Sequence, residues 1–77
     1  MIRRQTEDAT MIFSLECEVE NDGRWIAEVP ELPGVLAYGG TKNEAMAKAE
    51  VLALRVLADR LEHLEDGPQD IRISVPA

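Results

Sequence analysis

The sequence predicts an α+β domain with the element order βββαβ: a three-stranded antiparallel meander, one helix on one sheet face, and a fourth strand. Three observations predict this fold class. Apolar and polar residues alternate over residues 11–19 and again over 24–29, as they do in half-buried strands. From Thr41 the apolar spacing becomes helical and stays so to about Leu64. The length of 77 residues fits one domain, residues 1–77.

The first two strands are expected to form a hairpin. Residues 1–10 are polar and unpatterned and are expected to be flexible. The strand over residues 11–19 then leads to Asn21-Asp22-Gly23, whose residues tolerate the backbone of a tight turn. Cys17 falls on the core side, and Trp25 is expected to anchor the small core. The opposite, polar face of the two strands is expected to carry Ile12, Glu16, Glu18, Ile26 and Glu28.

A third strand and the helix follow a proline-rich break. Pro30-Glu31-Leu32-Pro33-Gly34 ends the second strand, and a short third strand is expected over residues 35–38. Thr41-Lys42-Asn43-Glu44 has the form of a capping box, in which Thr41 accepts from the N–H of Glu44 and Glu44 reaches back to the N–H of Thr41. The core side of the helix is expected to carry Ala45, Met46, Ala49, Leu52, Ala53, Val56, Leu57 and Leu64.

The last strand is expected around Ile71, Ile73 and Val75, which alternate with Arg72 and Ser74. Gly67-Pro68 precedes it and favours the end of the helix.

The helix has a second apolar stripe that the sheet cannot cover. Its members are spaced by three and four residues and are Ala47, Val51, Leu54, Ala58 and Leu61. Scattered apolar residues are common on protein surfaces, so one interpretation is ordinary surface. A domain of this size buries only about 60% of its unfolded surface, which makes oligomerisation a common source of added stability. We therefore expect this stripe to be a homo-oligomer interface.

The charge distribution limits the possible partners. Formal net charge is −7, and residues 11–40 hold one base, Arg24, against six acids. Such a surface disfavours direct binding to nucleic acid, which requires a basic patch, and to anionic membranes. It favours attraction to a basic protein.

The sequence does not predict an enzyme, a metal site or a cofactor. It has one Cys and one His, and the last strand adds no carboxylate to those of the first two strands, as two-metal cleavage would require. The longest near-apolar run, residues 51–58, is broken by Arg55 and is too short to span a membrane. Because the first residues also lack the apolar core of a signal peptide, a cytoplasmic protein is expected.

Two motifs resemble the HicB antitoxin family. Residues 21–34 read Asn-Asp-Gly-Arg-Trp-Ile-Ala-Glu-Val-Pro-Glu-Leu-Pro-Gly, and Gly40-Thr41 with Glu44-Ala45 opens an alanine- and leucine-rich helix. The resemblance covers about residues 11–75. It implies a partial RNase-H-like domain that neutralises HicA, a small basic toxin that cleaves RNA. HicB proteins commonly add a DNA-binding domain, and no such segment is present in these 77 residues, so direct operator binding is not expected.

The resulting hypothesis is an antitoxin-like, protein-binding module that occludes a basic HicA-type toxin and also self-associates. The candidate contact residues are Ile12, Glu16, Glu18, Ile26, Glu28, Glu31 and Tyr38. The alternative is a homo-oligomeric regulatory or ligand-sensing domain that has no toxin.

Overall fold

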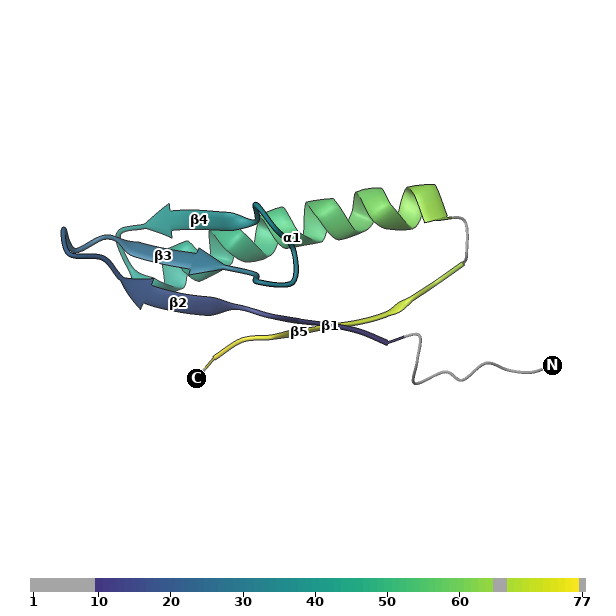
Figure 1. The fold of residues 1–77 in the computed structure, drawn as a ribbon, viewed down its shortest axis with the longest axis horizontal. Coiled ribbons are helices and arrows are strands. Elements are labelled where there is room, and N and C mark those ends of the chain that lie inside the picture. Colours follow the sequence, from purple (N-terminus) through teal and green to yellow (C-terminus); the bar gives the residue numbers. More distant parts are fainter. Residues whose placement is uncertain (1–9, 65–66, 77) are drawn as a thin grey trace.

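The computed structural model describes residues 10–64 and 67–76. Within these ranges the elements are β1 (Thr10–Ser14), β2 (Glu16–Val19), β3 (Trp25–Glu28), β4 (Leu36–Gly39), α1 (Lys42–Leu64) and β5 (Asp70–Ser74). An antiparallel sheet has the order β2-β3-β4, while β1 and β5 pair in parallel. The helix lies along one face of the antiparallel sheet (Figure 1). The α+β class, the meander and the helix expected from the sequence are confirmed. Residues 1–9, expected to be flexible, lie outside the described residues.

The prediction of a single first strand over residues 11–19 is wrong in one respect. This segment is divided at Leu15 into β1 and β2. The two halves pair with different neighbours. The N–H of Leu15 donates to the carbonyl of Ser74 at 3.0 Å, in line with the β1–β5 ladder, whereas Glu16 begins the pairing with β3. Thr10, expected to be flexible, already belongs to β1. The alternation of side chains continues through the break, so the sequence pattern could not reveal it.

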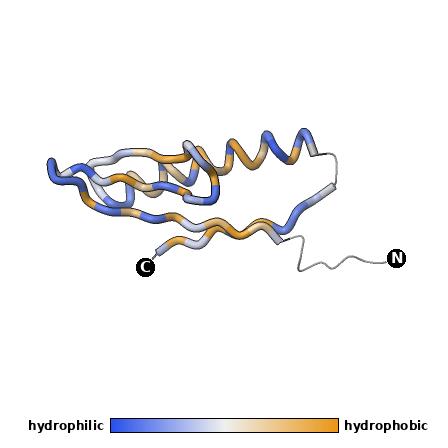
Figure 2. The backbone as a smooth tube through the Cα atoms, in the orientation of Figure 1, coloured by the Kyte–Doolittle hydropathy of each residue, from blue (hydrophilic) through white to orange (hydrophobic). Residues whose placement is uncertain are grey.

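The turn between β2 and β3 joins them into the expected hairpin. The N–H of Glu20 donates to the Arg24 carbonyl at 2.7 Å, and the N–H of Gly23 donates to the Glu20 carbonyl at 3.0 Å. Gly23 has a φ of 91°, which an L side chain rarely adopts and which explains the glycine. Figure 2 shows hydrophilic residues at this turn and hydrophobic residues along β1 and β5.

The helix begins with the expected cap, altered in one contact. The N–H of Glu44 donates to Thr41 Oγ1 at 3.1 Å, as predicted. The Glu44 carboxylate, however, accepts from the N–H of Gly40 at 2.6 Å, so the expected return contact to Thr41 is displaced by one residue. The pKa of Glu44 is lowered, first by this N–H of Gly40 and then by Lys48, whose ammonium lies 3.3 Å away.

The start of the helix is pressed against the end of β4. A Cβ added to Gly39 would lie 2.6 Å from the Ala45 nitrogen and 3.1 Å from the Ala45 Cα. Ala27 on β3 and the helical residues Ala49 and Ala53 are all fully buried. Small side chains on both layers therefore let the helix approach the sheet closely.

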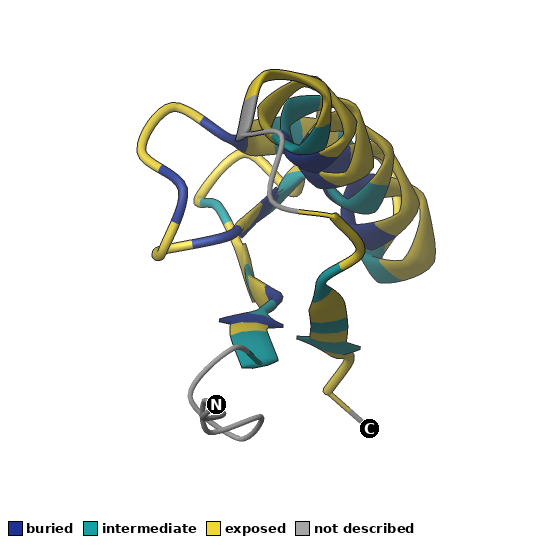
Figure 3. Cartoon of the chain, turned by 90° about the vertical axis from the view of Figure 1, so that its right-hand side faces the viewer, coloured by how far each residue is buried: buried dark blue, intermediate teal, exposed yellow. Residues whose placement is uncertain are grey.

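The core lies between the sheet and the inner side of α1, where the buried helical residues face the strands (Figure 3). Val29 and Leu32 are its largest fully buried side chains. Trp25, expected as the anchor, is only half-buried at the core's margin, and Leu52, expected on the core side, is exposed. Trp25 stands beside Val19 and Gly39 at the end of the sheet, where the close approach of the helix leaves little internal space. The predicted core position of Leu64 lies outside the described side chains.

Candidate protein-binding faces

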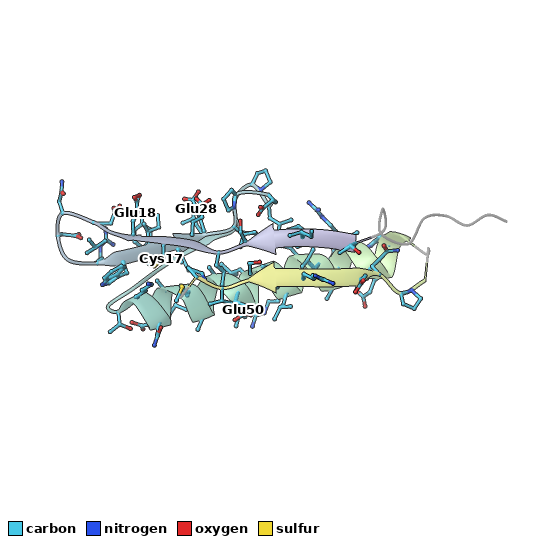
Figure 4. The ribbon with its side chains drawn as sticks, turned by 90° about the horizontal axis from the view of Figure 1, so that it is seen from below. Cys17, Glu18, Glu28 and Glu50 are labelled. Atoms are coloured by element: carbon cyan, nitrogen blue, oxygen red, sulfur yellow. The ribbon has the colours of Figure 1, made fainter. Side chains whose placement is uncertain are left out.

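The antiparallel sheet has an outer face, defined by six side chains that point away from α1. Strand register arranges them in two rows, Glu16–Glu28–Leu36 and Glu18–Ile26–Tyr38. Figure 4 shows Glu18 and Glu28 pointing to one side and Cys17 pointing to the other. Acidic side chains occupy the β2 margin of the outer face, and apolar ones occupy the β4 margin. The outer face is thus acidic along one edge and apolar along the other.

Two of its carboxylates stand directly opposite each other. Glu16 and Glu28 are Cα partners in the β2–β3 ladder, and both are exposed. Like charges directly across two strands destabilise the pair. Glu16, Glu18, Ile26 and Glu28, with Cys17 at the edge, line a shallow depression of about 200 Å³. Within residues 10–64 and 67–76, no ion pair neutralises these three glutamates.

Arg24 is the base nearest to this face in sequence, but it contacts Asp22 and Tyr38 and not the glutamates. Its Nε donates to Asp22 Oδ2 at 2.9 Å, and its guanidinium carbon lies 4.5 Å from the centre of the Tyr38 ring. The pKa of Asp22 is lowered, first by the backbone N–H of Arg24, which donates to the carboxylate at 3.1 Å. Arg24 therefore covers one side of Tyr38 and leaves the glutamates of the outer face unpaired.

Glu31, expected as a partner contact, is bound within the chain. Its carboxylate accepts from the Ser14 N–H at 3.1 Å and from the Ser14 hydroxyl at 3.0 Å. These bonds lower the pKa of Glu31, with the Ser14 N–H as the largest cause. β3 ends at Glu28 and therefore does not extend far enough to lie beside β1. Among the described residues, the edge of β1 at Ser14 has no neighbouring strand on that side. Glu31 thus satisfies the edge of β1, and its carboxylate is held in place by contacts within the chain.

The structure brings together most of the remaining candidates. Glu16, Glu18, Ile26, Glu28 and Tyr38 share the outer face, and Tyr38 is 40% exposed. Ile12 is 62% exposed but lies on β1, beyond the two rows.

The prediction missed Leu36, which is 42% exposed and occupies the outer face opposite Glu28. Its position two residues before Tyr38 in the same strand was the signal that could have found it.

A second surface lies on the far side of the molecule. The helix stripe, defined as Ala47, Val51, Leu54, Ala58 and Leu61, is exposed except for Leu61, which is half-buried. Val51 and Leu54 are 46% and 50% exposed. Beside the stripe, Ala37 of β4 joins Ala47, Lys48, Val51, Leu52 and Arg55 around an open groove of about 420 Å³. The stripe is thus uncovered, as the sequence predicted.

In residues 10–64 and 67–76 no group of three or more His, Cys, Asp or Glu side chains is placed to hold a metal ion. Over the same ranges, no helix combines the length and apolar character needed to cross a bilayer.

Comparison of the chain with protein-family models, with curated proteins and with solved structures gives no match.

Proposed function

We propose that this chain is a protein-binding domain whose outer face takes a basic protein partner. One observation carries the proposal: Glu16, Glu18 and Glu28 are grouped without a neutralising base among the described residues, beside exposed Leu36 and Tyr38. A Lys or Arg placed between Glu16 and Glu28 would replace their mutual repulsion with attraction. The apolar margin would supply the dehydrated area that gives such an interface its affinity.

The partner class that fits best is a small basic toxin that cleaves RNA, of the HicA type. The support is the resemblance of residues 21–34 and of the helix opening to HicB antitoxins, together with the acidic sign of the outer face. A protein that binds RNA must present a basic surface to the phosphates. An acidic face that covers this surface would block access of RNA without any reaction. Both proteins would then act in the cytoplasm.

The test is inhibition of a purified HicA-type toxin from the same genome. Without the chain, the toxin should cleave RNA. It should lose this activity as the chain is added, with complete inhibition near equal concentrations of the two proteins. The double variant Glu16→Lys, Glu28→Lys should require at least about tenfold more protein for the same inhibition, because it converts attraction into repulsion. Glu62→Lys is the matched control, since Glu62 is an exposed glutamate on the helix.

Equal inhibition by both variants would remove the outer face from the mechanism. Self-association of the chain without binding to any basic protein would favour the alternative, a homo-oligomeric regulatory domain.

A further inference from the structure

The helix stripe has the spacing of a two-helix seam. Its members follow one another at intervals of four, three, four and three residues, which is the heptad repeat of paired helices. Val51 and Leu54 form its centre, and the alanines Ala47 and Ala58 flank them. A β-branched residue at the first core position of the heptad with Leu at the second favours two helices rather than three or four. Small residues at 47 and 58 allow two backbones to approach.

The charges beside the stripe distinguish between the two possible helix orientations. Glu50 flanks it on one side and Arg55 on the other, and neither takes part in an ion pair within residues 10–64 and 67–76. In a parallel pair, a residue at the Glu50 position faces the residue five places further along the second helix, which is Arg55. The two-fold axis then creates this attractive pair twice. In an antiparallel pair, Val51 would instead pack against Leu54 of the second helix. Lys48 would then lie beside Arg55 of the second helix, and the two-fold axis would create this repulsive contact twice.

From this pattern we propose that two copies of the chain associate through the helix stripe as a parallel, in-register helix pair. Because α1 is already folded on its sheet, the cost of ordering the helix does not fall on association. Glu50 points away from the side that carries Glu18 and Glu28 (Figure 4), so the seam and the outer face lie on different sides. Each dimer would therefore keep both outer faces free for partners.

Charge exchange tests the orientation in the full-length chain by sedimentation. Arg55→Glu should weaken the dimer about tenfold, because two attractive pairs become repulsive. Glu50→Arg should do the same, and the double exchange Glu50→Arg, Arg55→Glu should restore the affinity. A stronger dimer with Arg55→Glu would indicate the antiparallel pair, because Lys48 would gain an attractive partner, and would overturn the proposal. A monomeric wild type at high micromolar concentration would also overturn it.

Crosslinking gives an independent measure of orientation that does not depend on affinity. In a Cys17→Ser background, Ala47→Cys should form an intermolecular disulfide under mild oxidation, because the two copies of position 47 face each other in the parallel pair. In the antiparallel pair these positions are separated by about 16 Å along the axis, too far for a disulfide. Ala58→Cys should behave in the same way, and Asp59→Cys, exposed outside the stripe, is the control. Crosslinking only in a mixture of the two stripe variants would contradict the proposal.

This interface uses the helix, whereas the proposed function uses the outer face of the sheet. Absence of the helix pair would therefore not contradict binding of a basic partner, and absence of partner binding would not contradict the helix pair.

Discussion

Glu16 and Glu28 face each other directly across β2 and β3 on the exposed side of the sheet. Their repulsion is a cost that the isolated domain carries and that a cationic partner would remove. A site that is locally unfavourable in the free protein is a common mark of a binding surface, because natural sequences depart from local consistency where function requires it.

The first prediction concerns stability without a partner. Glu28→Gln should raise the melting temperature by about 2 °C, because removal of one of two facing charges is worth a few tenths of a kcal/mol in a domain of this size. The gain should vanish at about 1 M salt, where the screening length is short. Thermal melts at two salt concentrations measure both effects, with Glu62→Gln as the control. A lower melting temperature would show that Glu28 makes a stabilising contact.

The second prediction concerns association with a basic partner. Glu16→Lys with Glu18→Lys should slow association at least about tenfold and should reduce its dependence on salt, because long-range attraction accelerates encounter. Stopped-flow measurements at two ionic strengths give these rates. Melting curves serve as the folding control, since both side chains point away from the core. Association rates that ignore both salt and charge reversal would exclude electrostatic attraction by the outer face.

The third prediction uses two adjacent glycines. Gly39→Ala should destabilise the fold by about 1–3 kcal/mol, because the added Cβ would lie 2.6 Å from a backbone nitrogen at the start of α1. Gly40→Ala is the matched control, since a Cβ there meets only the Glu44 carboxylate, at 3.5 Å. Urea unfolding of the two variants provides the comparison. Equal losses would mean that the helix start can shift away from β4.

The fourth prediction concerns acid. The pKa of Glu31 in the folded chain is below its ordinary value of 4.5, so its carboxylate stabilises the fold above about pH 4.5. This contribution is lost as the pH falls through the lowered pKa of the folded state. Glu31→Gln should therefore lower the melting temperature at neutral pH and should flatten its decline in acid. Glu62→Gln should leave the curve unchanged, and a decline as steep in Glu31→Gln as in the wild type would exclude this role.

Much of the fold could be predicted because the signals are local. The hairpin follows from two alternating runs around an Asp-Gly turn, and the helix start follows from Thr41 and Glu44. The polar face of the hairpin follows from its period of two, which places Glu16, Glu18 and Glu28 together once the register is known.

The remaining features depend on contacts that no local pattern encodes. Glu31 accepts hydrogen bonds from Ser14, 17 residues earlier. A carboxylate that the sequence predicts as a partner contact is therefore hydrogen-bonded within the chain. The break at Leu15 arises from a change of neighbouring strand while the side-chain pattern continues unchanged. The size of Trp25 favours it as the anchor of the core, but its place at the end of the sheet decides its burial.

The parallel pairing of β1 with β5 bears on the order in which the domain assembles. Thr10 is the register partner of Asp70, 60 residues away, whereas the hairpin, β4 and the helix connect through short loops. Closing a long loop costs more chain entropy than closing a short one, so the β1–β5 ladder should form last and open first. Such an opening would uncover Phe13 while the hairpin and the helix remain folded. Amide hydrogens of β5 should then exchange with solvent faster than those of β3, which lies inside the antiparallel sheet.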